Sequence, residues 1–175
     1  VIYEKLSRYT FCISSNSFFQ TNTNGTEKLY EVIKSFLMEK KINLLWDLYY
    51  GAGTISIFIS EYCKKIIGFE IVQSAIADAE INMKLNNITN CKFVPGDLKD
   101  TIREYINDKP DVIIIDPPRS GVHKDVIEAV MIANPEQIIY VSCNPQTQAR
   151  DLEILCKNYN VIDIQPVDMF PHTMH

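Results

Sequence analysis

Apolar runs of strand length alternate with helix-like segments along almost the whole chain. The runs contain few polar residues, which is typical of strands in a sheet that is covered on both faces. Helices that connect successive strands allow those strands to run parallel. The sequence therefore predicts a doubly wound α/β fold with a mostly parallel sheet. The predicted strands are residues 44–50, 65–70, 91–97, 111–116, 137–143 and 160–167, and the helices between them are residues 54–63, 74–87, 98–107, 123–134 and 145–158.

Another helix is predicted ahead of the first strand, over residues 24–40. Its apolar residues recur at helical spacing on one face, and Asn24 and Glu27 have the spacing of a capping box. No internal repeat, low-complexity tract or long linker interrupts the 175 residues. A chain of this length and pattern predicts one domain.

Composition and charge exclude several classes of function. No stretch approaches the roughly 18 consecutive apolar residues of a membrane span, and the start VIYEKLSRYT lacks the regions of a signal peptide. We therefore expect a cytoplasmic protein without membrane association. The net charge of -5 argues against binding nucleic acid through bulk electrostatics. If RNA or DNA is the substrate, a local patch or another part of the protein must supply most of the affinity.

The cysteines and histidines form no metal-binding or disulfide pattern. The five cysteines are odd in number and widely spaced, with no CxxC pair, and the three histidines do not complete a ligand set. We expect neither a metal site nor a disulfide framework. These residues are Cys12, Cys63, Cys91, Cys143, Cys156, His123, His172 and His175.

A glycine-containing turn and an acid indicate a nucleoside cofactor. Gly51 and Gly53 follow the first predicted strand, and Glu70 ends the second, 19 residues after Gly51. Such glycines let the backbone approach a ligand, and such an acid suits ribose hydroxyls. The alternative is a tight turn beside an exposed acid. Ser56 stands where a dinucleotide fold has a third small residue, which favours S-adenosylmethionine, and Asp97 could reach an adenine edge or act as a turn residue.

The fourth predicted strand ends in the sequence DPPRSG, residues 116–121. Two prolines cannot continue a buried ladder, so they hold a stiff loop beside Asp116. This carboxylate either faces a cofactor or substrate, or it only caps the turn.

The fifth predicted strand ends at Cys143, ahead of Asn144 as a helix N-cap and Pro145 at the first helical position. A thiol beside a helix N-terminus ionises more readily than an ordinary one. Cys143 is therefore the candidate nucleophile. The other four cysteines are interpreted as inert core residues.

Six motifs together resemble the S-adenosylmethionine-dependent RNA uracil-5-methyltransferases, in order and spacing, over nearly the whole chain. They are FFQTN (18–22), DLYYGAGT (47–54), GFE (68–70), IIDPPRSG (114–121), YVSCNPQTQARDL (140–152) and DMFPHTMH (168–175).

The resemblance implies a class I, Rossmann-like methyltransferase fold, S-adenosylmethionine as cofactor and transfer or ribosomal RNA as partner. It makes Cys143 the nucleophile and Asp116 an orienting acid near cofactor and uracil. The implied cofactor-contacting residues, with the glycines of the turn, are Gln20, Tyr49, Gly51, Gly53, Thr54, Glu70, Asp97 and Asp116.

The chain departs from the family at Tyr50, where a cysteine is usual, and at its ends. The resemblance implies a glutamate base and a last strand beyond His175, and usually a separate N-terminal RNA-binding domain. Residues 1–175 are therefore interpreted as one catalytic domain of a longer protein. We expect the exchange at Tyr50 to be tolerated because the main chain acts in that turn.

The implied chemistry needs a thiolate because carbon 5 of uracil is a weak nucleophile. Addition of Cys143 to carbon 6 makes carbon 5 electron-rich, and a base later removes the carbon-5 proton. The target base must leave any stacked structure to be reached from both faces. Arg119, Lys124 and Arg150 either meet RNA phosphates or are solvated surface charges.

Four alternatives remain open from the sequence. Cytosine-5 methyltransferases carry the nucleophile in the loop after strand four, where this chain has Arg119. Nucleobase amino-methyltransferases need no cysteine. A nicotinamide-dependent dehydrogenase would bind a nucleotide but not S-adenosylmethionine. The chain could also bind the cofactor without turnover.

Overall fold

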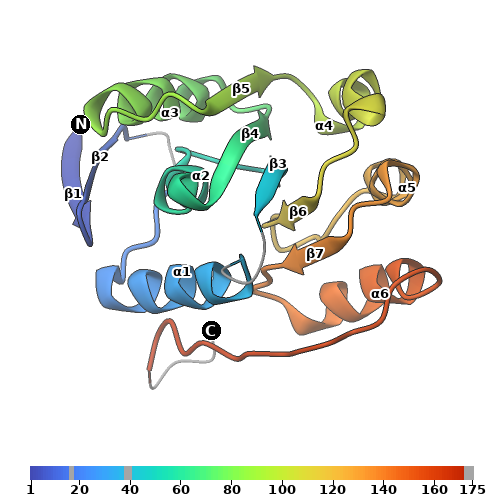
Figure 1. The fold of residues 1–175 in the computed structure, drawn as a ribbon. Coiled ribbons are helices and arrows are strands. Elements are labelled where there is room, and N and C mark those ends of the chain that lie inside the picture. The colour runs from blue at the N-terminus through green and yellow to red at the C-terminus, as the bar shows by residue number, and fades with distance from the viewer. Residues whose placement is uncertain (16–17, 38–40, 172–175) are drawn as a thin grey trace.

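The computed structural model describes residues 1–15, 18–37 and 41–171. Five parallel strands form the central sheet in the order β5-β4-β3-β6-β7 (Figure 1). The chain starts this sheet at β3 in the centre, builds outward to β5, and then returns to add β6 and β7 on the other side. This confirms the doubly wound prediction, with the reversal between β3 and β6. The bounds are β3 Ile42–Leu48, β4 Cys63–Glu70, β5 Cys91–Pro95, β6 Val112–Ile115 and β7 Gln137–Tyr140.

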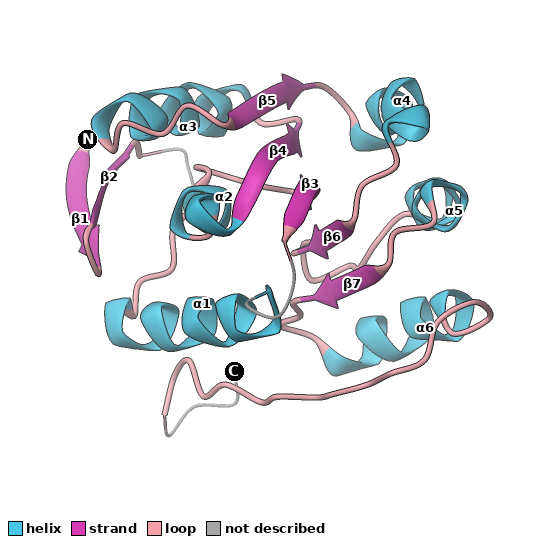
Figure 2. Cartoon of the chain, in the orientation of Figure 1, coloured by secondary structure: helices cyan, strands magenta, loops and turns pink. Residues whose placement is uncertain are grey.

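Helices cover both faces of the sheet (Figure 2). Neighbouring residues of one strand face opposite sides: Leu45 packs with α1, α2 and the N-terminal hairpin, and Trp46 packs with α4, α5 and α6. Both faces are therefore apolar, which explains the continuous apolar runs in the sequence. The helices are α1 Thr23–Leu37, α2 Thr54–Phe58, α3 Gln73–Leu85, α4 Leu98–Thr101, α5 Lys124–Ala133 and α6 Pro145–Leu155, with the 3-10 turns η1 Ser60–Tyr62 and η2 Ile102–Asp108.

A separate antiparallel hairpin precedes the sheet and was not predicted. Its strands are β1 (Ile2–Leu6) and β2 (Tyr9–Ile13), joined by Ser7 and Arg8. One edge of β2 pairs with β1, and its other edge faces α3.

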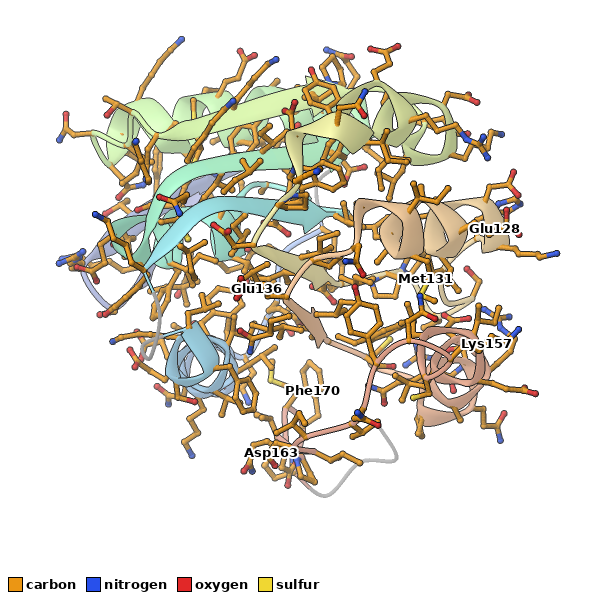
Figure 3. The ribbon with its side chains drawn as sticks, turned by 45° about the vertical axis from the view of Figure 1, so that its right-hand side comes forward. Glu128, Met131, Glu136, Lys157, Asp163 and Phe170 are labelled. Atoms are coloured by element: carbon orange, nitrogen blue, oxygen red, sulfur yellow. The ribbon has the colours of Figure 1, made fainter. Side chains whose placement is uncertain are left out.

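The predicted strand at residues 160–167 is wrong. This segment has no ladder partner in the described structure and lies outside the sheet, below α6 and α1 in Figure 1. Ile162 is 91% exposed, so its apolar alternation is not buried by a sheet. Figure 3 shows Asp163 on the outer side of this segment and Phe170 turned toward the body of the molecule.

Several predicted helix bounds also change. The predicted helix 54–63 ends at Phe58, and Cys63 already belongs to β4. Helix 98–107 becomes a short α4 followed by the 3-10 turn η2. α1 begins at Thr23, so the predicted capping box is wrong: the Asn22 side chain accepts from the Gly25 amide at 3.0 Å. Residues 38–40 of that predicted helix, and residues 172–175 of the FPHTMH motif, lie outside the described residues.

No helix in the described part of the chain is long and apolar enough to cross a membrane.

Candidate active site

The carboxyl ends of the parallel strands bring the predicted site residues to one edge of the sheet. Leu48 pairs with both Phe69 and Ile115, and Ile115 pairs with Tyr140. The residues that follow these paired positions therefore leave the sheet at the same height along the strands. They include Tyr49, Glu70 and Asp116, while Asp97 and Cys143 follow β5 and β7 at the same edge.

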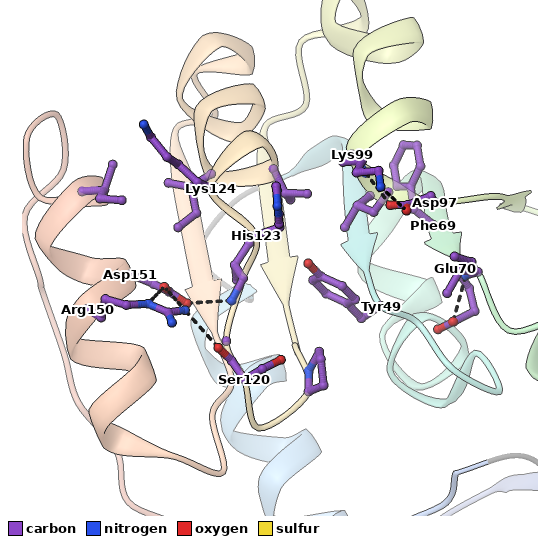
Figure 4. A pocket seen from close by; sticks show the side chains of 18 residues that line it. Tyr49, Phe69, Glu70, Asp97, Lys99, Ser120, His123, Lys124, Arg150 and Asp151 are labelled. Carbon is purple, nitrogen blue, oxygen red and sulfur yellow. Dashed lines mark hydrogen bonds and ion pairs between the residues drawn. The ribbon is translucent and has the colours of Figure 1, made fainter.

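A cavity of about 680 Å³ opens at this edge (Figure 4). Tyr49 lies in the middle of the view, with Glu70 and Asp97 on one side and Arg150 on the other. Lys124 also belongs to the lining. The other predicted site residues, all of them described, do not line this cavity: Gln20, Gly51, Gly53, Thr54, Asp116, Arg119 and Cys143.

The two glycines of the turn after β3 have different roles. Gly51 has φ +55°, and a Cβ there would meet nothing within 4 Å. Gly53 has φ +77°, and a Cβ there would lie 2.9 Å from the Phe93 ring. Gly51 therefore leaves open space at the turn, whereas Gly53 permits close packing beneath it. Next to this turn, the Thr54 and Tyr30 hydroxyls are 2.6 Å apart.

Glu70 joins this turn to the end of β4. Its Oε2 accepts from the Gly51 amide at 3.1 Å, and its Oε1 accepts from the amides of Ile71 and Val72 at 2.8 and 2.9 Å. Each carboxylate oxygen has two lone-pair sites, so acceptor capacity remains for a further donor such as a ribose hydroxyl.

Asp97 is the N-cap of α4 and is held in its ionised form. Its side chain accepts from the Lys99 amide at 3.2 Å, and the Lys99 ammonium lies 3.0 Å from its Oδ2. The hydrogen bond from Lys99 lowers the pKa of Asp97 below its ordinary value. An ionised carboxylate on the cavity wall can accept a hydrogen bond from an amino group.

Two carboxyl groups near the place between β3 and β6 where the strand order reverses have raised pKa values. Burial raises the pKa of Asp116 to about 6. Burial also raises the pKa of Asp47 to about 7, although Ser56 donates to its Oδ2 at 2.5 Å. Ser56, which departs from the dinucleotide pattern, therefore holds a buried acid below the turn.

Tyr49 occupies the backbone position between β3 and the turn. Its φ is +66°, in the left-handed region, and its ring lines the cavity. Burial raises its pKa to about 12. The phenol is therefore neutral at ordinary pH.

Cys143 lies where the sequence predicted, exposed and just ahead of α6. Asn144 is the N-cap, its side chain accepting from the Gln146 amide at 3.0 Å, and Pro145 begins the helix. Cys12, Cys63 and Cys91 are buried, as expected. Cys156 is exposed, so its interpretation as a core residue is wrong, because it lies just past the end of α6.

The loop of Asp116 and the loop of Cys143 are tied together by α6. The Asn144 side-chain Nδ2 and the Thr147 hydroxyl donate to the Arg119 carbonyl at 3.2 and 3.3 Å. Arg150 donates to the Ser120 carbonyl at 3.0 Å and to Asp151 at 2.8 Å. The predicted phosphate-contacting Arg150 is thus also a brace between the two loops (Figure 4).

Asp151 is the centre of this brace and was missed by the sequence analysis. It is 1% exposed and accepts from the Val122 amide at 2.8 Å and from the Tyr140 hydroxyl at 2.7 Å. The only sequence signal for this contact was that Asp151 directly follows the oppositely charged Arg150. Ile71 was also missed: it lines the cavity although it is 61% exposed, and it directly follows Glu70.

The remaining predicted residues are placed as follows. Gln20 is half-buried ahead of α1. Arg119 is exposed in the loop after β6, and Lys124 is exposed at the start of α5, 3.6 Å from Glu128. Among the described residues, no group of three or more His, Cys, Asp or Glu side chains could hold a metal ion.

Strand order and the site at the switch point define a domain with the class I methyltransferase fold. A precorrin-6y C5,15-methyltransferase of Geobacter metallireducens shares this fold, with a TM-score of 0.63 over 84% of this chain and 76% of that chain at 18% identity. The family model for tRNA (uracil-5-)-methyltransferases matches residues 2–175. The chain belongs to this family, which confirms the resemblance found in the motifs.

Individual relatives agree with this membership. Uncharacterized RNA methyltransferases of Bacteroides thetaiotaomicron and Clostridium tetani are each 46% identical over 99% of this chain. The chain spans 39% and 38% of the lengths of these curated relatives. A solved tRNA (uracil-54, C5)-methyltransferase of Pyrococcus abyssi, in complex with S-adenosyl-L-homocysteine, has a TM-score of 0.85 and 33% identity over 98% of this chain and 41% of that chain.

Proposed function

We propose that this chain is the catalytic part of an enzyme that transfers a methyl group from S-adenosylmethionine to carbon 5 of a uridine in transfer or ribosomal RNA. The observation that carries the proposal is the exposed Cys143 at the start of α6, held in one unit with the Asp116 loop at the carboxyl edge of the sheet. Family membership supports the reaction class. We expect such an RNA-modifying enzyme in the cytoplasm.

The cavity at the strand ends suits the adenosine part of S-adenosylmethionine. Glu70 would accept from the ribose hydroxyls, and Asp97 from the adenine amino group. The open space over Gly51 would let the turn approach the rest of the molecule. The resemblance adds Gln20, Tyr49, Thr54 and Asp116 as contacts. When bound, this cofactor supplies a methyl group attached to a positively charged sulfur.

Cys143 would start the reaction as a thiolate that adds to carbon 6 of the uracil. The new sulfur–carbon bond would move the ring electrons toward carbon 5 and the carbon-4 oxygen. Carbon 5 would then take the methyl group as the methyl–sulfonium bond breaks, and the electron pair of that bond leaves with S-adenosylhomocysteine. Loss of the carbon-5 proton to a base returns the electron pair to the ring and releases Cys143. Asp116 would orient uracil and cofactor, and the resemblance assigns the base to a glutamate beyond His175.

The RNA would reach this edge with its target base turned out of any stack. Arg119 and Lys124 are exposed beside the site, and the side chain of Arg150 is 54% exposed although it also braces the loops. These three cations would meet phosphates. They offer the local patch that a chain with net charge -5 needs in order to bind RNA.

Analysis of the methylated nucleoside tests this proposal. After incubation of the full enzyme with unmodified RNA and S-adenosylmethionine, digestion and mass spectrometry should detect 5-methyluridine. The Cys143→Ser enzyme should form none, whereas Cys156→Ser, which removes the other exposed cysteine, should retain activity. Full activity in Cys143→Ser, or methylation at an exocyclic amine, would contradict the proposal and favour a nucleobase amino-methyltransferase.

A further inference from the structure

Two side chains of α3 and the side chain of its C-cap residue pair with the edge of the hairpin that faces this helix. The amides of Ser14, Cys12 and Thr10 donate to the side chains of Asp78, Asn82 and Asn86 at 2.8, 2.6 and 2.9 Å. Four residues of helix advance about 6.0 Å, and two residues of strand advance about 6.6 Å. The spacing of the three acceptors therefore matches the spacing of the amides of Thr10, Cys12 and Ser14, which are every second residue along the chain.

Asn82 differs from the other two because it also reaches the turn after β3. It is completely buried, and its Nδ2 donates both to the Cys12 carbonyl at 3.2 Å and to the Ala52 carbonyl at 3.0 Å. An amide nitrogen has two hydrogens, so its donor capacity is fully used. The hydrogen bond that Cys12 donates to Oδ1 fixes which way the amide faces.

Ala52 lies in the middle of the turn, between the two glycines. Its carbonyl belongs to the peptide whose amide, on Gly53, donates to the Tyr50 carbonyl at 2.9 Å. The peptide between Ala52 and Gly53 is therefore hydrogen-bonded through both its carbonyl and its amide. Earlier in the turn, the Gly51 amide donates to Glu70. Glycine permits many backbone conformations, so a turn that contains two of them needs such outside contacts to keep one shape.

We infer that Asn82 is a positioning residue for S-adenosylmethionine, acting through the Ala52 carbonyl, and that it couples the hairpin to the cofactor turn. The inference rests on the proposed binding of this cofactor at the turn. Asn82 touches neither substrate nor cofactor in this role. Its effect should therefore appear as a change in cofactor affinity and not only as a loss of stability.

Asn86, the C-cap residue of the same helix, provides a matched control. It pairs with the Thr10 amide and carbonyl, at 2.9 and 2.8 Å, as Asn82 pairs with Cys12. In the described structure Asn86 does not hydrogen-bond to the turn. Asn82→Ala and Asn86→Ala therefore both remove a pairing with β2, and only the first also frees Ala52.

The experiment measures the dissociation constant for S-adenosylhomocysteine by calorimetry, well below the unfolding midpoint of each variant. Both variants should unfold at lower temperature. Asn86→Ala should keep its affinity within about twofold, and Asn82→Ala should weaken binding about tenfold, the equivalent of one well-placed hydrogen bond. In turnover assays of the full enzyme, the KM for S-adenosylmethionine should rise while the KM for RNA stays unchanged.

Equal affinity in the two variants would overturn the inference and leave Asn82 a purely structural residue. If Asn82→Ala does not fold, Asn82→Asp replaces it, since aspartate keeps the acceptor for Cys12 and loses the donor to Ala52. The same loss of affinity is expected, and unchanged affinity again overturns the inference. Failure of the unaltered chain to bind S-adenosylhomocysteine would overturn the cofactor assignment itself, and the inference with it.

Discussion

Tyr50 occupies a position where the resemblance implies a cysteine, and a neighbouring glycine explains how the larger ring fits. The Tyr50 ring stacks on Phe93 with centroids 4.3 Å apart. A Cβ on Gly68 would lie 2.6 Å from the Tyr50 ring, so a side chain at residue 68 would displace the tyrosine. The Tyr50 ring is thus accommodated beneath the turn, against Phe93 and Gly68. The Gly51 backbone and the Glu70 side chain form the other side of the turn.

Asp116 gives a prediction on pH, because burial raises its pKa to about 6. Below pH 6 the group is mostly neutral, and above pH 6 it is an anion that, in the proposed function, would attract the charged sulfur and amino group of S-adenosylmethionine. Affinity should therefore rise about tenfold between pH 5 and pH 7, if the ionised form alone binds well. Calorimetry at both pH values measures this change.

Asp116→Asn should flatten that pH dependence. The control is Asp47→Asn, because Asp47 is a fully buried acid whose pKa is also raised, to about 7. If Asp47→Asn flattens the profile and Asp116→Asn leaves it intact, the titrating group has been assigned wrongly. For folding the sign is opposite: the folded protein disfavours the ionised forms, so stability falls as pH rises from about 4 to about 6 for Asp116 and from about 4 to about 7 for Asp47.

At the scale of elements, the central sheet could be predicted because burial of both faces leaves a direct trace in the sequence. The runs around Trp46, Ile67 and Ile114 are apolar at successive positions, and each now lies between two layers of helices. The sequence could therefore also place Glu70 and Asp116 at the carboxyl ends of neighbouring parallel strands.

The hairpin and the C-terminal segment were not predictable in the same way. The Thr10 amide donates to the side chain of Asn86, 76 residues along the chain, and no local sequence pattern predicts such a contact. Residues 160–167 have the alternation of a strand, but a strand also needs a neighbour, and the described structure gives it none. The contacts of Asp151 were missed for the same reason as the pairing of Thr10, because they join residues about 30 positions apart in the sequence.

Asp151 gives a prediction at the element scale, because it holds the loop after β6 against α6. Asp151→Ala removes acceptors for Val122, Tyr140 and Arg150 in a buried place and should lower the free energy of unfolding by about 2–4 kcal/mol. Chemical denaturation measures this loss. RNA methylation should also fall, because Arg119 and Cys143 lose their common support.

Glu153→Ala is the matched control, since Glu153 is exposed on the same helix. Its free energy of unfolding should stay within about 0.5 kcal/mol of the unaltered chain. An Asp151→Ala chain as stable as Glu153→Ala would show that the two loops do not depend on this carboxylate.

On the scale of the whole molecule, two layers of helices position one edge of the sheet, which holds the proposed cofactor cavity, the proposed nucleophile and the three predicted RNA-contacting cations. The cavity takes its walls from the ends of β4 and β5 and from α5 and α6, while Cys143 and Asp116 stand on the neighbouring strand ends. In the proposed function, Arg119, Lys124 and Arg150 would supply local contacts to RNA phosphates beside this thiol.

The proposed covalent step can be observed with RNA that contains 5-fluorouridine, whose carbon-5 fluorine cannot leave as a proton does. Mass spectrometry of the full enzyme after incubation with this RNA and S-adenosylmethionine should show one adduct, on the peptide that contains Cys143. The adduct should be absent in Cys143→Ala and present in Cys156→Ala. RNA binding without an adduct, or an adduct that persists in Cys143→Ala, would contradict the assignment of Cys143 as the nucleophile.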